Sequence, residues 1–211
     1  MARYLGPREK IERRIGEKLG LKGERSHTPK SATVRKPYPP GMHGRNFKGK
    51  SSEFGTQLRS KQKVRNIYRL MEKQFKQTVQ KALETKTEPY NAIVQGLESR
   101  LDNVVFRMGL AQSRDQSRQL VNHGHILVNG KRISIPSYKV KLSDAISVRE
   151  GSKSSPYFST SVTNWMKNYN APDWLEVDKE KPSATIKRYP GIEDSGLRAD
   201  DLQLLIEYYS R

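Results

Sequence analysis

A change in the spacing of apolar residues, in the middle of the chain, constrains the fold most strongly. From Asn91 to Met108 the apolar residues recur at three- and four-residue steps, which predicts one amphipathic helix. A capping box that opens at Ser113 predicts a second, shorter helix. Apolar residues then alternate on both sides of Asn129-Gly130, a strong hairpin signal. The pattern therefore predicts two helices and then a small antiparallel sheet, with later strands over residues 138–142 and 146–148.

Arginines recur on the two predicted helices. Arg100 and Arg107 are seven residues apart, and Arg114 and Arg118 are four apart, so each pair shares one stripe of a helix. One such pair alone ordinarily belongs to a solvated surface. Four arginines on adjacent helices of a strongly basic chain favour contact with phosphate instead.

The net charge of the 211 residues is +18, and it is distributed unevenly. Residues 1–70 hold 19 lysines and arginines against 5 acidic residues, whereas residues 171–211 hold 6 against 9. A polyanion is the partner that the first third predicts. An anionic membrane surface is the rival, but no lipidation motif and no basic amphipathic helix with aromatic residues begins the chain.

Composition excludes several protein classes. The chain has no cysteine, so it forms no disulfide and no thiolate metal site. Met1–Gly20 carries charges throughout and no apolar run, so we predict no signal peptide. No stretch is long and apolar enough to predict a membrane span. These features predict a cytoplasmic protein.

The first half of the chain divides into an arm and a helix. Residues 8–21 have the pattern of a short helix, but residues 22–50 lack a hydrophobic period and predict an extended arm. Residues 58–84 keep the helical period and predict one amphipathic helix. Its first turns carry four cations where the helix dipole favours acids, so we predict that they bind a polyanion; a solvated face is the alternative. These cations are Lys61, Lys63, Arg65 and Arg69.

Several motifs occur in a fixed order along nearly the whole chain. They are Arg3-Tyr4-x-Gly6-Pro7, Tyr38-Pro-Pro-Gly41 with His43-Gly44, Lys61-Gln-Lys63 with Ile67-Tyr68, the segment from Leu97 to Tyr138, Trp174-Leu175, and the ending Glu207-Tyr-Tyr-Ser-Arg211. Each alone is weak, but together they are specific. The sequence resembles the small-subunit ribosomal protein S-four family, in its bacterial form. Its central module also occurs, more loosely, in pseudouridine synthases and tyrosyl-tRNA synthetases.

The resemblance implies an α+β fold of three parts. A basic, extended N-terminal arm spans residues 1–50 and a helical domain spans residues 51–90. The RNA-binding module, with two helices and a small antiparallel sheet, spans residues 91–170. The C-terminal tail, residues 171–211, returns to complete the helical domain, so that the module is inserted in it.

The resemblance also implies a function. The chain would be a structural constituent of the small ribosomal subunit, in the cytoplasm, and a primary binder of small-subunit rRNA at a junction of the 5′ domain. It would nucleate assembly of the subunit body, lie near the channel through which mRNA enters, and contribute to translational accuracy. Neighbouring ribosomal proteins S-five and S-three are its expected protein partners, and no membrane is expected.

Arginine can fork across phosphate oxygens and stack on bases, and tyrosine and histidine can stack on unpaired bases. We predict rRNA contacts by Arg3, Tyr4, Arg8, Arg13, Arg14, Arg25, Arg35, Lys36, Tyr38, His43, Lys61, Lys63, Arg65, Arg69, Arg100, Arg107, Arg114, Arg118, His123 and Lys131. By the resemblance, the loop that holds Arg45, Lys48 and Lys50 is assigned to mRNA.

Two other functions stay open. Arg100-Leu101-Asp102 is similar to the motif around the catalytic aspartate of pseudouridine synthases. Because Leu101 faces inward on the predicted helix, we expect Asp102 to pair with a neighbouring arginine, and we predict no enzyme activity. The other alternative is a free-standing RNA-binding regulator of translation that never joins ribosomes.

The resembled family often holds zinc with four cysteines in the N-terminal arm. The matching positions here are Glu9, Glu12, Ser26 and Ser31, and serine is a poor zinc ligand. The histidines have no partners at ligand spacing. We therefore predict no metal site and no cofactor.

Overall fold

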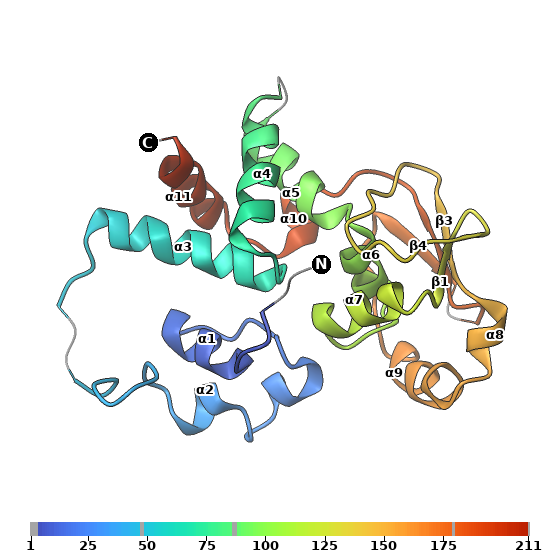
Figure 1. Cartoon of the computed structure of the whole chain (residues 1–211), viewed down its shortest axis with the longest axis horizontal. Helices are drawn as coiled ribbons and strands as arrows, with labels where there is room; N and C mark the ends of the chain where they lie inside the picture. Colours follow the sequence, from blue (N-terminus) through green and yellow to red (C-terminus); the bar gives the residue numbers. More distant parts are fainter. Residues whose placement is uncertain (1–3, 47–48, 86–87, 179, 211) are drawn as a thin grey trace. The chain divides into compact units, whose positions relative to one another are not determined.

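A computed structural model describes residues 4–46, 49–85, 88–178 and 180–210 (Figure 1). The chain divides into two compact units. The first unit comprises Met1–Ile93 with Leu197–Arg211, and the second comprises Val94–Gly196. Helices and one small antiparallel sheet make up the described structure, so the predicted α+β class is confirmed. Over these same ranges, no helix is both long enough and apolar enough to cross a membrane.

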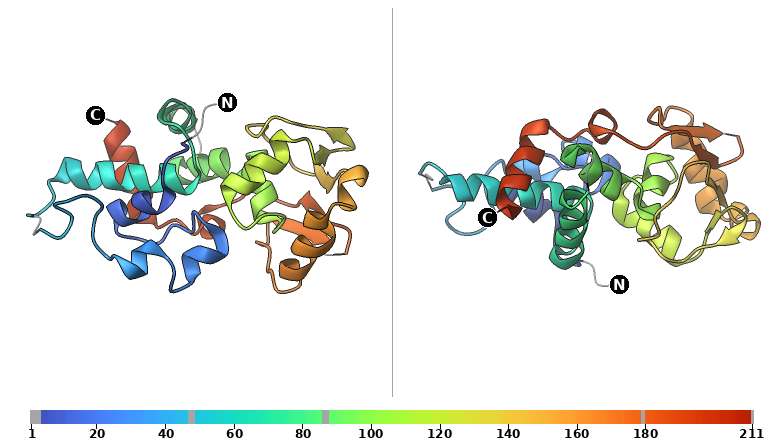
Figure 2. Two further views of the ribbon diagram at one scale, coloured as in Figure 1. Left: turned by 60° about the horizontal axis from the view of Figure 1, so that its bottom comes forward. Right: turned by 90° about the horizontal axis from the view of Figure 1, so that it is seen from above.

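The first unit is helical. Its elements are α1 (Arg8–Ile15), the 3-10 turn η1 (Gly23–His27), α2 (Ala32–Arg35), α3 (Glu53–Ile67), α4 (Glu72–Leu83), the start of α5 (Pro89–Glu98), and α11 (Ala199–Tyr209). Helix α3 begins where the hydroxyl of Ser52 accepts a hydrogen bond from the backbone N–H of Gly55, at 3.2 Å. Leu202 and Leu205 of α11 are fully buried, and α11 packs on α3 (Figures 1 and 2).

The predicted extended arm is wrong over residues 22–36, which contain η1 and α2. Polar side chains organise this segment where a hydrophobic period is missing. The buried carboxylate of Glu12 accepts the backbone N–H groups of Leu19 and Leu21, at 3.2 and 3.1 Å. The hydroxyl of Ser26, also buried, accepts the N–H of Lys22 at 3.1 Å. Local side-chain caps of this kind leave no periodic signal in a sequence.

The predicted helix over residues 58–84 is two helices, α3 and α4. Between them Arg69 has a positive φ of 56°, a left-handed conformation that no helix continues through. Tyr68 and Leu70 on either side of it are buried, so the turn directs side chains into the unit. The helical spacing of apolar residues continues unchanged across this turn, so the turn could not be predicted from the sequence.

The second unit contains the sheet. Its elements are α6 (Leu101–Arg107), α7 (Arg114–Asn122), β1 (Ile126–Val128), β2 (Lys131–Arg132), β3 (Ala145–Val148), α8 (Glu150–Lys153), the π-helical turn η2 (Tyr157–Val162), α9 (Thr163–Met166), β4 (Leu175–Asp178), β5 (Ser183–Ile186) and α10 (Ile192–Ser195). The strand order is β2-β1-β3-β5-β4, and all pairs are antiparallel. One apolar core lies between the sheet and the helices, and Val105, Ile126, Ile146 and Trp174 are fully buried in it.

The predicted helix from Asn91 to Met108 is also wrong, because α5 ends at Glu98 and α6 begins at Leu101. The backbone of Ser99 accepts the N–H of Val140 at 2.9 Å, and Leu101 donates to the carbonyl of Tyr138 at 2.8 Å. These tertiary hydrogen bonds replace helical ones. They also hold residues 138–140 against this break, so that the strand predicted over residues 138–142 is absent from the described sheet.

The predicted C-terminal tail is too long. Strands β4 and β5 pair with each other and, through β5, with β3, so residues 175–186 belong to the second unit. Only Leu197–Arg211 returns to the first unit. Trp174 supplies the physical reason, because its fully buried ring anchors the start of β4 in the core of the sheet.

Replacing Leu202 with Ala should destabilise the first unit by about 2–5 kcal/mol, because it leaves a cavity between α11 and α3. Both tryptophans, Trp165 and Trp174, lie in the second unit. In urea unfolding of this variant, circular dichroism should therefore show one transition with a lowered urea midpoint. The midpoint measured by tryptophan fluorescence should stay unchanged. The matched control is exposed Gln203→Ala on the same helix, with an effect of about 0.5 kcal/mol or less. Equal shifts of both signals for Leu202→Ala would mean that the two units unfold as one.

Candidate nucleic-acid interface

The carboxylate of Glu98 is fully buried and is the centre of a polar network in the second unit. Arg107 donates two hydrogen bonds to it, from Nε to Oε2 at 2.9 Å and from Nη2 to Oε1 at 2.7 Å. Asn103 adds a third, from Nδ2 to Oε2 at 2.6 Å. Arg107 also donates to the carbonyl of Ser195 at 2.8 Å. A buried charge requires such partners, so this network holds α5, α6 and α10 together.

A second buried carboxylate continues the network. Arg100 donates from Nε and Nη2 to the two oxygens of Asp102, at 3.1 and 2.9 Å, which confirms the predicted pairing of Asp102 with an arginine. Arg118, of which 3% is exposed, lies 4.0 Å from Oδ2 of Asp102. Arg114 donates to Oδ1 of Asn103 at 2.7 Å.

The four arginines therefore do not form two free stripes. Arg100 precedes α6 and Arg107 ends it, so they do not share a helix face as predicted. All four guanidinium groups lie within 4.0 Å of Glu98 or Asp102. Their direct contact with RNA stays a prediction, and their observed role is to neutralise buried carboxylates.

Aromatic side chains cap the end of α6. Tyr157, Trp165 and Tyr169 donate hydrogen bonds to the carbonyls of Leu110, Gly109 and Arg107, at 2.7, 2.6 and 3.1 Å. Burial raises the pKa of Tyr157 and that of Tyr169. Gly109 has a positive φ of 81°, and a Cβ there would lie 2.6 Å from the Tyr169 ring. Glycine is therefore required at this position.

Most of the cations predicted on α3 are also paired. Lys61 and Arg65 bind the carboxylate of Glu72 at 2.8 and 3.1 Å. Lys63 binds Glu17 at 2.6 Å and Asp201 at 2.7 Å. Partial burial alone would lower the pKa of Lys63, but its hydrogen bonds to the two carboxylates outweigh burial and raise it. These three side chains chiefly join elements of the first unit.

A groove between α1 and α3 in the first unit has a different lining. Its volume is about 640 Å³. Its lining residues include five cations and no acid: Lys10, Arg14, Arg59, Arg65 and Arg69. Lys10, Arg14 and Arg59 are exposed, and within the described ranges none of their charged groups has an ion-pair partner. These three exposed, unpaired cations thus give the groove a concentrated positive charge of the kind that attracts phosphate.

Tyr4 and Arg69 form one end of this groove. The guanidinium carbon of Arg69 lies 5.5 Å from the centroid of the Tyr4 ring, and Nη2 donates to the Tyr4 carbonyl at 3.3 Å. A Cβ on Gly6 would lie 2.4 Å from the Tyr4 hydroxyl oxygen, so glycine allows the ring to fold back here. Tyr4 remains 43% exposed.

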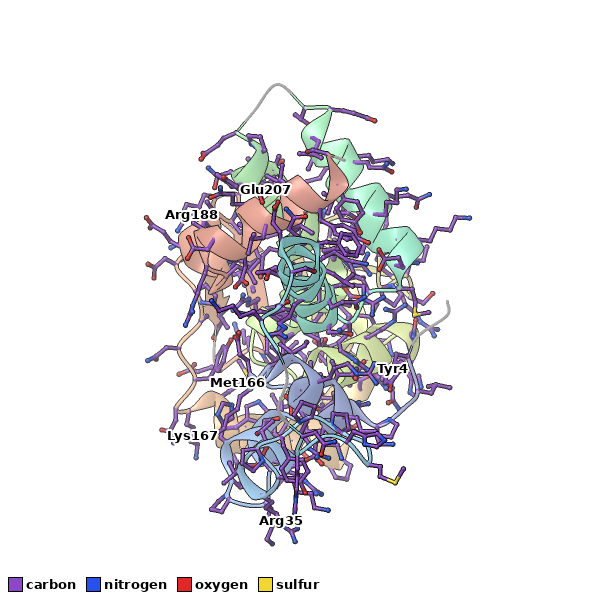
Figure 3. All side chains as sticks on the ribbon, turned by 90° about the vertical axis from the view of Figure 1, so that its left-hand side faces the viewer. Tyr4, Arg35, Met166, Lys167, Arg188 and Glu207 are labelled. Carbon is purple, nitrogen blue, oxygen red and sulfur yellow. The ribbon has the colours of Figure 1, made fainter. Side chains whose placement is uncertain are left out.

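Smaller basic hollows lie beside the groove. Lys36 lines two of them, together with Arg35 in one and Arg59 in the other. Both Arg35 and Lys36 are exposed, and Arg35 points outward (Figure 3). We use the name basic surface for five exposed cations that line the groove or the hollows: Lys10, Arg14, Arg35, Lys36 and Arg59.

Tyr38 lies between two guanidinium groups near this surface. The guanidinium carbons of Arg13 and Arg45 are each 4.9 Å from its ring centroid. Arg45 also donates to the Tyr38 hydroxyl at 3.3 Å, and this hydrogen bond lowers the pKa of Tyr38. Arg13 is fixed by the carbonyls of Lys36 and Tyr38, both at 3.0 Å. The arginines thus hold the Tyr38 ring in one orientation.

The remaining predicted site residues are distributed over both units. Arg8 is half-buried and Arg25 pairs with Glu9, whereas exposed positions are held by His43, Lys50, His123 and Lys131. Arg3 and Lys48 lie outside the described residues. Three lining residues of the groove, Lys10, Arg59 and Gln62, are not among the predicted site residues. Their signal was the four-residue step from Lys10 to Arg14 and the three-residue steps along α3 from Arg59 through Gln62 to Arg65.

At the four positions that the resemblance matches to zinc ligands, Glu12, Ser26 and Ser31 are hydrogen-bonded and Glu9 pairs with Arg25. Glu12 binds backbone N–H groups as described above, and the hydroxyls of Ser31 and Thr33 are 2.8 Å apart. Across the ranges that the structure describes, no three histidine or acidic side chains form a group suited to a metal ion. The absence of zinc stays a prediction.

Comparison with known proteins identifies the family. Residues 3–98 match the family model "Ribosomal protein S4/S9 N-terminal domain", and residues 99–146 match the "S4 domain". Proteins named "Small ribosomal subunit protein uS4" from Thermotoga petrophila and Thermus thermophilus are 47% and 44% identical over 211 residues, which cover both chains fully. The protein of that name from Acetivibrio thermocellus is 49% identical over 215 residues, again with full coverage. The chain belongs to the uS4 family. The resemblance that the motifs indicated is confirmed.

In this uS4 family member, replacing Glu98 with Gln should destabilise the second unit by about 3–5 kcal/mol, because the half-buried guanidinium of Arg107 would lose its buried carboxylate partner. The midpoint of tryptophan fluorescence in urea measures this loss. Glu150→Gln is the matched control, because its ion pair with Lys153 is on the surface and contributes less than about 1 kcal/mol. Similar midpoints for the two variants would contradict a structural role for the network.

Proposed function

We propose that the chain is a structural constituent of the small ribosomal subunit and binds small-subunit rRNA directly through its basic surface. The observation that carries this proposal is the groove between α1 and α3, with three exposed cations that no carboxylate neutralises within the described ranges. Its family membership is the independent support, since the matched relatives are named as small-subunit proteins. A cytoplasmic, ribosome-bound and non-catalytic protein follows from the same reasoning.

The mode of binding that suits this surface is recognition of RNA shape. Double-helical RNA hides its base edges in a deep, narrow groove, so proteins mostly contact its phosphates, 2′-hydroxyls and junctions. Exposed arginines and lysines along two helices can follow a phosphate backbone without reading sequence. We infer that the primary target is the multi-helix junction of the 5′ domain, where bridging of RNA helices would nucleate assembly of the subunit body.

The hairpin end of the second unit offers further contacts. Lys131 and Arg132 of β2 are exposed, and Arg132 donates to the carbonyl of His123 at 3.4 Å. His123 is exposed beside them. We propose that these three residues form a second RNA-binding surface, and that binding at both surfaces fixes the angle between two RNA helices.

Two finer roles are part of the proposal. Exposed Arg45 and Lys50, with Lys48, would contact mRNA near the channel through which it enters the subunit. An interface with the neighbouring protein S-five, and a further one with S-three, would influence translational accuracy.

The double variant Arg14→Ala/Arg59→Ala should bind a 5′-domain rRNA fragment more weakly, because two phosphate contacts are lost. The slope of log affinity against log salt concentration should become shallower by roughly two or less. Filter binding against excess tRNA, over a range of salt concentrations, measures both quantities.

The matched control is Lys73→Ala/Lys76→Ala, which removes the same charge from exposed positions on α4 outside the groove. It should leave the affinity and the slope nearly unchanged. An equal loss in both double variants would mean that net charge alone binds the RNA, and binding that tRNA abolishes in the unmodified protein would refute specific rRNA recognition.

A further inference from the structure

We propose that the groove between α1 and α3 binds one unpaired adenine nucleotide of the rRNA, its phosphate held by Lys10, Arg14 and Arg59 and its base by Gln62. This inference rests on the proposed rRNA-binding function and specifies the ligand of the same site. It would make the first unit read a base as well as the RNA backbone.

The size and walls of the groove suit a nucleotide. Its volume of about 640 Å³ lies within the range of small-molecule sites. Ile11, Ile15, Leu58, Leu70 and Met71 give it apolar walls. Ile15 and Leu70 are buried, whereas Met71 is 40% exposed. A flat base can be buried against such walls while its phosphate stays with the cations at the exposed rim.

Gln62 is the polar group suited to the base edge. It is half-buried, whereas Arg59 is exposed, and its side-chain amide has no hydrogen-bond partner in the part of the chain that the structure describes. An amide offers one donor group and one acceptor, which pair with N7 and N6 of adenine. Guanine offers two acceptors on the same edge and would suit an arginine instead. The amide therefore favours adenine.

The base must be unpaired to enter. The N6 and N7 edge of adenine is inaccessible in an RNA helix, because the major groove is deep and narrow. Bases that proteins read in RNA are those of loops, bulges and junctions, splayed out of the stack. A junction nucleotide is the form of RNA that satisfies both the cations and the amide.

The end of the groove is held in a strained conformation. Arg69 has a φ of 56°, which is unusual for a residue with a side chain. The contacts of its guanidinium with Tyr4 fix both residues. Arg69 is 7% exposed, whereas Tyr4 is 43% exposed. Strained residues of this kind concentrate at binding sites. They give the groove a preformed wall, which lowers the entropy lost when a ligand is bound.

The test uses the full chain and three fluorescently labelled hexaribonucleotides: hexauridine, and hexauridine with one internal adenine or one internal guanine. The unmodified protein should bind the adenine oligomer about fivefold or more tightly than hexauridine, which is the low end of the discrimination that one amide–base pair gives. Gln62→Ala should abolish that preference and keep the affinity for hexauridine. Arg14→Ala should weaken binding of all three oligomers to a similar extent.

Gln77→Ala, an exposed glutamine on α4, is the matched control and should retain the preference. Equal affinity for the three oligomers, failure to bind any of them, or a preference that survives Gln62→Ala would overturn the proposal. So would a preference for guanine that Arg59→Ala removes. Specific binding of the 5′-domain fragment is measured separately. If it persists in any of these cases, the proposed function stands and only the adenine site is rejected.

Discussion

Two buried carboxylates, Glu98 and Asp102, make the second unit possible. The break between α5 and α6 turns Arg100 toward the interior, and it places Arg107 beside Glu98. A buried guanidinium without a partner is unfavourable by several kcal/mol, so the fold depends on these acids being in place. The network then fixes the ends of α6 and α7 and, through the carbonyl of Ser195, the segment that leaves the sheet.

The same requirement explains why the basic residues divide into two groups. The chain has 40 lysines and arginines and 22 acidic residues, so pairing cannot neutralise every cation. Some buried or half-buried cations have an acidic partner, as Lys61 has Glu72 and Lys63 has Asp201. The cations of the basic surface have no such ion-pair partners in the described structure, and they lie close enough together to act on one polyanion. The cations proposed to bind RNA thus differ from the structural ones in their lack of an ion-pair partner within the described ranges, and not in their residue type.

Elements with a local sequence signal could be predicted. Ser113 caps α7, and the turn at Asn129 and Gly130 has positive φ values of 50° and 76°. Elements whose backbone is decided by distant segments could not be predicted. The break at Ser99 and Arg100 is stabilised by residues 138–140, which no helical periodicity includes. For the same reason only part of the candidate site could be predicted. Lys63 pairs with Asp201, which lies far along the chain, and spacing alone cannot distinguish a paired cation from an unpaired one.

Chemical labelling of lysine amines, read by mass spectrometry in the free protein and in its complex with the 5′-domain rRNA fragment, tests this division most directly. Lys10 and Lys36 of the basic surface should react in the free protein and be protected in the complex. Lys76 on α4 should react equally in both states, and Lys63, paired twice, should react slowly in both. Equal labelling of Lys10 and Lys36 with and without rRNA would contradict the account, because the unpaired cations of the first unit would then not contact the RNA.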